Sequence, residues 1–210
     1  MKNIILYGAP AAGKGTQCEL LIERMGYKHI STGELFRSLD DSTELGRSIH
    51  EKIAKGILID DETTATLVKN RLNELDGPVV LDGFPRTLNQ AKILDTFFDN
   101  YVVINIEVEE EVALKRTLGR VNCPNCGRIY NIYTEMKPKQ EGICDDCGAS
   151  LKGRSDDNEE SFKVRFNTYL ANVGSVLDYY KEKDALYIIK SHESKEDTYT
   201  DIKKILDCQD

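Results

Sequence analysis

Short apolar runs alternate with amphipathic stretches along most of the chain. Residues 2–7 are apolar and β-prone, which is typical of a strand buried on both faces of a parallel sheet. Residues 8–15 break this run with Gly, Ala and Pro, and residues 16–25 then place apolar side chains at helical spacing. The first unit is therefore predicted to be a strand, a glycine loop and a helix.

The same alternation continues along the chain and predicts the fold class. Further strands are expected at 27–30, 78–81, 101–108 and 185–189, and further helices at 31–39, 43–55, 61–75, 87–98, 109–119, 157–183 and 195–207. Alternating strands and helices predict an α/β fold with a parallel sheet and right-handed crossovers. Sheets of this kind bind ligands at the carboxyl ends of their strands, so we expect the site there.

The glycine loop carries the first chemical signal. Residues 8–14 read Gly-Ala-Pro-Ala-Ala-Gly-Lys and fit G-x4-G-K, after a buried strand and before a helix. Backbone N–H groups of such a loop converge on phosphate oxygens, and the helix N-terminus adds about half a positive charge. Lys14 supplies a cation for the outer phosphates. The alternative is a tight strand-to-helix turn with an exposed lysine.

The loop departs from the general pattern at its end. Lys14 is followed by Gly15 and only then by Thr16, so the usual direct hydroxyl ligand to Mg²⁺ is displaced by one position. Asp82 ends a buried apolar strand, where a phosphate-loop protein places its second acid. We therefore expect Mg²⁺ to be held by phosphates and water, with Asp82 reaching it through a water molecule.

Residues 121–153 lack helical periodicity and carry four cysteines in two C-x2-C pairs, Cys123 with Cys126 and Cys144 with Cys147. The 17 residues between the pairs fit the spacing of a tetrahedral site. Four thiolates suit structural Zn²⁺ and leave no open coordination position. Iron is an alternative occupant, and two disulfides or four free thiols are the alternatives without a metal.

A zinc ribbon that binds nucleic acid is the rival interpretation of this segment. Residues 121–153 hold four basic and four acidic residues, so their charge is zero before the thiolates are counted. A binding ribbon is expected to be basic with exposed aromatic side chains. The charge balance therefore argues against nucleic acid.

The composition of the chain narrows the range of possible binding partners further. The 210 residues carry a net charge of −8, which disfavours sequence-independent DNA binding and anionic membranes. No apolar run approaches the roughly 20 residues that span a bilayer, and no signal peptide is recognisable at the start. A cytoplasmic location is the expectation.

Cys18 and Cys208 are expected to be buried small residues, and the three histidines show no ligand spacing.

The motifs taken together resemble those of the adenylate kinase family, in its long, zinc-bearing bacterial form. The likeness spans nearly the whole chain and rests on GAPAAGKGT at 8–16, STGELFR at 31–37, LIDDE at 58–62, DGFPRT at 82–87 with Gln90, LKRTLGR at 114–120, and GRSDD at 153–157 with Arg165. Three departures are visible: Ala11 stands where Gly is usual, Asp60 where Pro is frequent, and the segment after Arg37 is about one residue short.

This resemblance implies a P-loop nucleoside monophosphate kinase fold and the reaction ATP + AMP ⇌ 2 ADP, which balances the adenine nucleotides. It implies a core of residues 1–29, 60–120 and 159–210, a helical AMP-binding arm at 30–59, and a zinc-stapled lid at 121–158. ATP, AMP and ADP would be the partners of a monomer that uses Mg²⁺ with ATP.

The resemblance also implies roles for individual residues. The catalytic set would be Lys14, Arg37, Arg86, Arg120, Arg154 and Arg165. The ATP-binding set would be Ala11, Ala12, Gly13, Lys14, Gly15, Thr16, Arg116, Arg120, Ile129 and Tyr130. The AMP-binding set would be Thr32, Arg37, Ile57, Leu58, Ile59, Gly83, Phe84, Pro85, Arg86, Gln90, Arg154 and Arg165. Arginine suits phosphate because its planar group donates two parallel hydrogen bonds and keeps its charge.

Two other functions stay open at this point. One is a kinase for UMP or CMP, which would share the phosphate loop and the arginines. The other is a phosphate-loop protein that binds a nucleotide without transferring phosphate, which the six arginines argue against.

Overall fold

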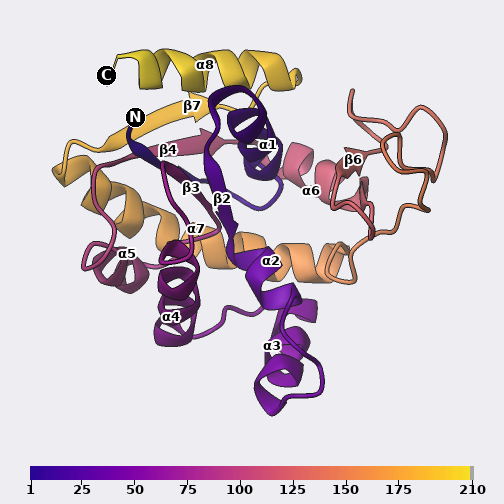
Figure 1. The fold of residues 1–210 in the computed structure, drawn as a ribbon, viewed down its shortest axis with the longest axis horizontal. Coiled ribbons are helices and arrows are strands. Elements are labelled where there is room, and N and C mark those ends of the chain that lie inside the picture. Colours follow the sequence, from indigo (N-terminus) through magenta and orange to yellow (C-terminus); the bar gives the residue numbers. More distant parts are fainter. Residues whose placement is uncertain (209–210) are drawn as a thin grey trace.

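A computed structural model describes residues 1–208 and contains a five-stranded parallel sheet at its centre (Figure 1). The strands are β1 (Asn3–Tyr7), β2 (Lys28–Ser31), β3 (Val79–Asp82), β4 (Tyr101–Glu107) and β7 (Leu186–Lys190), in the order β2-β3-β1-β4-β7. β1 lies in the middle and is buried over Ile4–Tyr7, as its two-sided apolar pattern predicts. The predicted fold class is confirmed.

Helices cover both faces of the sheet. Ile4 and Leu6 of β1 face a core shared with α1 (Lys14–Met25) and α8 (Lys195–Asp207). Ile5 and Tyr7 face the other core, formed with α4 (Asp61–Leu72), α5 (Leu88–Leu94) and α7 (Glu159–Glu182). This division follows from the two-residue period of a strand, because successive side chains point to opposite faces. α6 (Glu110–Leu118) follows β4 and packs against α7.

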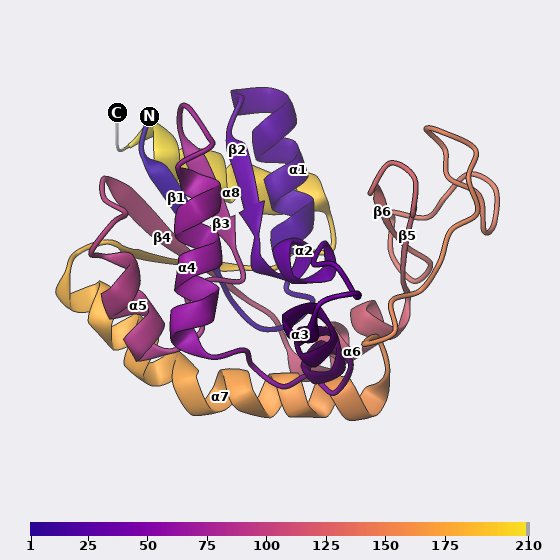
Figure 2. The ribbon, with the colours of Figure 1, turned by 60° about the horizontal axis from the view of Figure 1, so that its bottom comes forward.

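Two segments extend beyond these layers, residues 30–59 (Figure 1) and residues 121–158 (Figures 1 and 2). Residues 30–59, here called the arm, contain α2 (Thr32–Arg37) and α3 (Glu44–Ala54) and have an apolar cluster of Phe36, Ile49 and Ile59. Residues 121–158, here called the insert, start within β5 (Arg120–Asn122), which pairs in antiparallel fashion with β6 (Ile129–Asn131). The buried apolar residues of the insert are Cys123, Tyr130 and Cys144, so the insert has little apolar core of its own.

Helix starts follow from local side-chain caps more closely than from the apolar pattern. The predicted helix at 157–183 begins at Glu159 because the Asn158 side chain accepts a hydrogen bond from Ser161 N. Asp60, at the position where proline is frequent in the family, caps α4 by accepting from Thr63 N at 2.8 Å. This departure is therefore compatible with a regular helix start.

The two isolated cysteines differ in their surroundings. Cys18 is fully buried in α1, as expected, whereas Cys208 at the end of α8 is exposed. The prediction that both are buried is wrong for Cys208, because its position after the last turn faces away from the sheet core.

Candidate active site

The carboxyl ends of the strands open into one cavity of about 340 Å³. Gly8 follows β1, Ser31 and Asp82 end β2 and β3, and Ser191 follows β7, and all four residues line it. The arm and the insert contribute the remaining walls. Its volume is within the range of small-molecule sites, and its position is the one expected for a parallel α/β sheet.

The phosphate loop has the backbone geometry that its glycines predict. Gly8 has φ 140°, and a Cβ there would lie 2.5 Å from the backbone oxygen of Ile106, so the residue cannot carry a side chain without displacing β4. Gly13 caps α1 with φ 98°. Ala11 adopts φ 57°, a left-handed conformation that costs an alanine about 1 kcal/mol or more, which explains why glycine is usual there.

Lys14 lies folded onto this loop. Its Nζ donates hydrogen bonds to Gly8 O at 2.9 Å and to Ala9 O at 2.8 Å. Burial lowers the pKa of Lys14 to about 8, an effect that the charge of Asp82 partly offsets. The ammonium group is thus held where an anion would stabilise it.

Arginines surround the rest of the cavity and repel one another. Burial, together with Arg120 and Arg37, lowers the pKa of Arg154 to about 10. Burial also lowers the pKa of Arg86, with Arg165 and Arg37 adding to the effect. Buried positive charges repel one another, and this repulsion destabilises the cavity. An anionic ligand would offset it.

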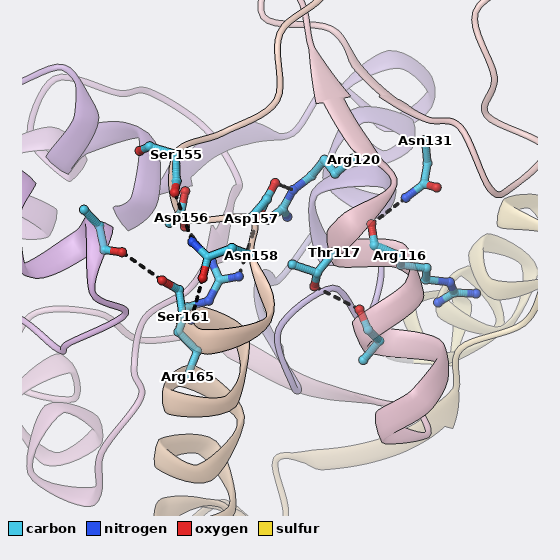
Figure 3. Close-up of polar contacts among 12 residues, drawn as sticks. Arg116, Thr117, Arg120, Asn131, Ser155, Asp156, Asp157, Asn158, Ser161 and Arg165 are labelled. Atoms are coloured by element: carbon cyan, nitrogen blue, oxygen red, sulfur yellow. Dashed lines mark hydrogen bonds and ion pairs between the residues drawn. The ribbon is translucent and has the colours of Figure 1, made fainter.

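Two acidic residues hold two of these arginines (Figure 3). Arg120 donates to Asp157 through Nε at 2.7 Å and also through Nη2. Arg165 donates to Asp156 at 2.6 Å, and its Nη2 lies 3.5 Å from Asp157 Oδ1. Arg165 Nε is buried and has no hydrogen-bond partner within residues 1–208. That donor is unpaired in this arrangement of the insert.

Arg116 differs from the other predicted arginines in that its guanidinium is hydrogen-bonded to the loop after β7. Its guanidinium donates to Ser191 Oγ at 2.6 Å and to His192 O at 2.9 Å, which ties α6 to the loop after β7. Ser191 in turn donates to Ala12 O of the phosphate loop. Sequence analysis missed Ser191, although its place two residues after the strand predicted at 185–189 is a signal that identifies it.

The second half of the cavity lies between the arm and the loop after β3. Thr32 Oγ1 donates to Gly83 O at 3.0 Å, and Arg86 Nε donates to the same oxygen at 2.8 Å. Gly83 has φ 83°, and a Cβ there would lie 2.6 Å from Thr32 Oγ1. Only glycine allows this close approach.

The amide oxygen of Gln90 already makes a hydrogen bond within the protein. This Oε1 atom accepts a hydrogen bond from Arg86 N at 2.7 Å, which leaves the amide NH₂ and the second lone pair of the oxygen for a ligand. Ile57, Leu58, Ile59 and Pro85 line the cavity beside it. Phe84, although predicted as a site residue, is 1% exposed and packs in the core beneath the sheet rather than lining the cavity.

The insert reaches the phosphate loop across the other half of the cavity. Ile129 Cδ1 would lie 3.6 Å from a Cβ on Gly15, and Thr16 Oγ1 lies 3.5 Å from Met136 Sδ. Glu135 accepts a hydrogen bond from Lys195 N at 2.7 Å. Tyr130 also lines the cavity, but its hydroxyl is directed into the insert, where it lies 3.5 Å from Cys144 Sγ.

The four cysteines of the insert converge as their spacing predicts. The sulfur atoms of Cys123, Cys126, Cys144 and Cys147 all lie within 4.8 Å of one another, with 3.3 Å and 3.5 Å for the two closest pairs. A tetrahedral Zn–S₄ site places its sulfurs about 3.8 Å apart. None of the four forms a disulfide, so the donor set fits a structural zinc ion.

This architecture defines a class of protein. A phosphate loop after the central strand of a five-stranded parallel sheet, a helical arm beside the loop after β3, and a cysteine-bearing insert are the features of a P-loop nucleoside monophosphate kinase. A sequence profile described as "Adenylate kinase" matches residues 6–185. The chain belongs to the adenylate kinase family.

Full-length relatives agree with this assignment. Proteins named "Adenylate kinase" from Caldicellulosiruptor bescii and Bacillus subtilis are 42% and 40% identical to the chain, each over 212 residues. These alignments cover 97% of this chain and 98% and 97% of the respective relatives. A protein of the same name from Bacillus licheniformis is 39% identical over 216 residues, with 99% of both chains covered.

Proposed function

We propose that the protein catalyses the reversible transfer of a phosphoryl group between ATP and AMP, giving two ADP, and so balances the adenine nucleotides. The observation that carries this proposal is the convergence of Lys14 and six arginines on one cavity with two halves. A protein that only binds a nucleotide has no need of six cations in both halves. Family membership supports the same activity.

In this proposal the phosphate-loop half binds ATP. The backbone of residues 11–16 and Lys14 hold the outer phosphates, and Arg116 and Ile129 border the path to the base. Tyr130 contributes its ring edge there, because its hydroxyl is engaged within the insert.

The other half binds AMP. Arg37 and Arg86 bind its phosphate, while Thr32, Gln90 and the backbone at 57–59 and 83 enclose the adenine. The Gln90 NH₂ donates to a ring nitrogen of the base, while Arg86 N holds the amide oxygen and so fixes the orientation of the side chain. Phe84 supports this half from the core and is not a contact residue.

Transfer occurs where the two halves meet. Arg120, Arg154 and Arg165 surround the phosphoryl group and stabilise the negative charge that is spread over its oxygens. The buried Nε of Arg165 is one donor already free for this role. Since the transferred group needs no covalent intermediate, the work of the protein is positioning and charge stabilisation.

We propose that residues 30–59 and 121–158 move as an arm and a lid over a core made of the remaining segments. Closing them excludes water, which would otherwise accept the phosphoryl group. The contacts of Thr16 with Met136 and of Lys195 with Glu135 lie where the lid meets the core.

Two metals complete the site. Zn²⁺ on the four cysteines, with iron as the alternative, would fix the insert, whose own apolar core is small. Mg²⁺ supplied with ATP would neutralise phosphate charge. Asp82 borders the cavity beneath Gly15, with its Oδ2 3.9 Å from a Cβ placed there, and would orient a water ligand of that metal.

We place the enzyme in the cytoplasm as a monomer, because free adenine nucleotides are its substrates. Within residues 1–208, no helix is long and apolar enough to cross a membrane.

The test starts from ADP alone with Mg²⁺, in which the enzyme forms equal amounts of ATP and AMP. Failure to form either product would disprove the proposal. A second assay supplies ATP with AMP, CMP, UMP or GMP, and AMP is expected to be the preferred acceptor. A preference for UMP or CMP would instead identify a pyrimidine nucleotide kinase.

A further inference from the structure

A second group of metal-ligating side chains lies beneath the phosphate loop, apart from the four cysteines of the insert. Cys18 of α1, His29 of β2 and Asp82 of β3 place one ligand atom each within 4.8 Å of one another. The three residues are far apart in the sequence and come together because α1 packs across β2 and β3. Linear spacing of the histidines therefore gave no sign of this group.

His29 is the residue that points to a ligand. Its Nε2 is buried and lacks a hydrogen-bond partner in the described part of the chain. A buried polar atom without a partner destabilises the folded chain, because it has lost its hydrogen bonds to water. This destabilisation is removed when the nitrogen coordinates a metal ion, for which neutral imidazole is a common ligand.

The group is open to the nucleotide cavity on one side. His29 and Asp82 line the cavity, whereas Cys18 is fully buried behind them. The group therefore borders the nucleotide cavity, and His29 and Asp82 are its two members that line that cavity.

We propose that Cys18, His29 and Asp82 form a binding site for a thiophilic divalent cation such as Zn²⁺, and that its occupation inhibits the enzyme. One sulfur, one imidazole nitrogen and one carboxylate oxygen are a donor set that Zn²⁺ accepts, with water or a phosphate oxygen in the fourth position. Binding displaces the thiol proton of Cys18 to solvent, and no oxidation or reduction takes place. Mg²⁺, which prefers oxygen ligands, is not expected to bind there.

The surrounding charges make this site weaker than the four cysteines of the insert. Lys14 and Arg86 are cations near Asp82 and oppose a second cation, while Glu19 and Glu34 are acids near Cys18 and favour it. Burial raises the pKa of the Cys18 thiol, so the proton must be displaced by the metal. We therefore expect Zn²⁺ to bind to the four cysteines of the insert first, and to Cys18, His29 and Asp82 only at higher Zn²⁺ concentration.

Inhibition is expected because Asp82 would serve both the proposed zinc site and the Mg²⁺ bound with ATP. This part of the proposal rests on the proposed function. A carboxylate bound to Zn²⁺ is no longer available to orient a water ligand of the ATP-bound Mg²⁺. The added positive charge also lies beside Lys14, which lowers the proton affinity of that lysine further. Binding of Zn²⁺ itself does not depend on catalysis and is measured without nucleotides.

The experiment titrates the enzyme, already loaded with one zinc ion, against Zn²⁺ in competition with a chromophoric zinc indicator. Wild type is expected to bind one further ion, and Cys18→Ala and His29→Asn to bind none. Cys208→Ala, which removes an exposed cysteine at the C-terminal end of α8, is the matched control and keeps the second ion. Absence of a second ion in wild type, or its persistence in both ligand variants, would overturn the site.

A second arm measures phosphoryl transfer at buffered free Zn²⁺ with excess Mg²⁺. Cys18→Ala is expected to raise the inhibitory Zn²⁺ concentration about tenfold or more, because even partners of metal ligands contribute that much. Equal inhibition of wild type and Cys18→Ala would show that zinc acts elsewhere, for example on the nucleotide. Melting curves of Cys18→Ala and His29→Asn show whether the two variants are folded. The number of zinc ions bound by wild type tests for a second zinc site independently of the variants.

Discussion

Arg120 and Asp157 form a two-point ion pair that joins the chain entering the insert to the chain leaving it. Arg120 begins β5 and Asp157 lies two residues before α7, so the pair closes the base of the insert (Figure 3). The side chain of Asp157 is 3% exposed and that of Arg120 is 18% exposed. The same arginine is a proposed catalytic group, so the pair couples the orientation of the insert to the charge at the transfer site.

Asp157→Asn should loosen this junction. The variant leaves the Arg120 charge with only part of its hydrogen bonding, which is expected to cost about 1–3 kcal/mol of unfolding free energy. Hydrogen exchange of residues 121–158 should speed up, and kcat should fall. Asp146→Asn, which removes an exposed pair with Arg128, is the control and should cost at most about 1 kcal/mol. Equal effects of the two substitutions would contradict the junction role.

Lys14→Ala tests the phosphate loop. The variant keeps the loop backbone but removes the only lysine in it, so kcat/KM should fall by about a hundredfold or more. The unfolding free energy at pH 7 should not fall, because burial disfavours the charged form of this lysine in the folded chain. Near-normal turnover would show that the loop does not bind the transferred phosphates.

The pH dependence of the reaction should report the same lysine. Its pKa of about 8 lies below the usual 10.5, and phosphate binding requires the protonated form. The value of kcat/KM for ATP should therefore decline above about pH 8, by up to about tenfold per pH unit. The decline in kcat should begin at higher pH, because bound phosphate raises the pKa of Lys14.

The same shift has a consequence for stability with a defined sign. Between about pH 8 and 10.5 the unfolded chain binds a proton at Lys14 that the folded chain does not. The unfolding free energy contributed by this residue therefore rises with pH through that window. The difference in melting temperature between wild type and Lys14→Ala, followed from pH 7 to 10, measures it, and a decrease would contradict the assigned shift.

Gln90→Glu tests base recognition with little change in shape. A glutamate carboxylate still accepts from Arg86 N, but it no longer offers a donor to the adenine. KM for AMP is expected to rise about tenfold or more, while KM for ATP stays unchanged. Equal changes in both constants would place Gln90 outside the AMP half.

Removing the metal from the four cysteines should act on stability first. The insert buries few apolar residues, so chelation is expected to lower its melting temperature and leave initial activity at low temperature largely intact. Calorimetry before and after a strong chelator, with metal content determined in parallel, measures the effect. Complete loss of activity with an unchanged melting curve would instead indicate a catalytic metal.

Much of the fold and site could be predicted from local patterns. The strand at 2–7, the loop at 8–14 and the two C-x2-C pairs each place their defining residues within a few positions of one another, and short-range geometry specifies their conformation. The structure confirms the sheet and the sulfur cluster. Helix boundaries differed by a few residues, because caps such as Asn158 rather than apolar periodicity determine where a helix begins.

The amino-acid sequence alone determined the alternation of elements, the phosphate loop, the thiolate cluster and the family resemblance, since all of these reside in residues near one another along the chain. Only the tertiary structure decided that Asp157 holds Arg120, that the amide oxygen of Gln90 is held within the protein, and that Phe84 supports the site from beneath. It also brought Cys18, His29 and Asp82 together. These relationships join elements distant in sequence, and their geometry depends on how helices pack across the sheet, which no local pattern encodes.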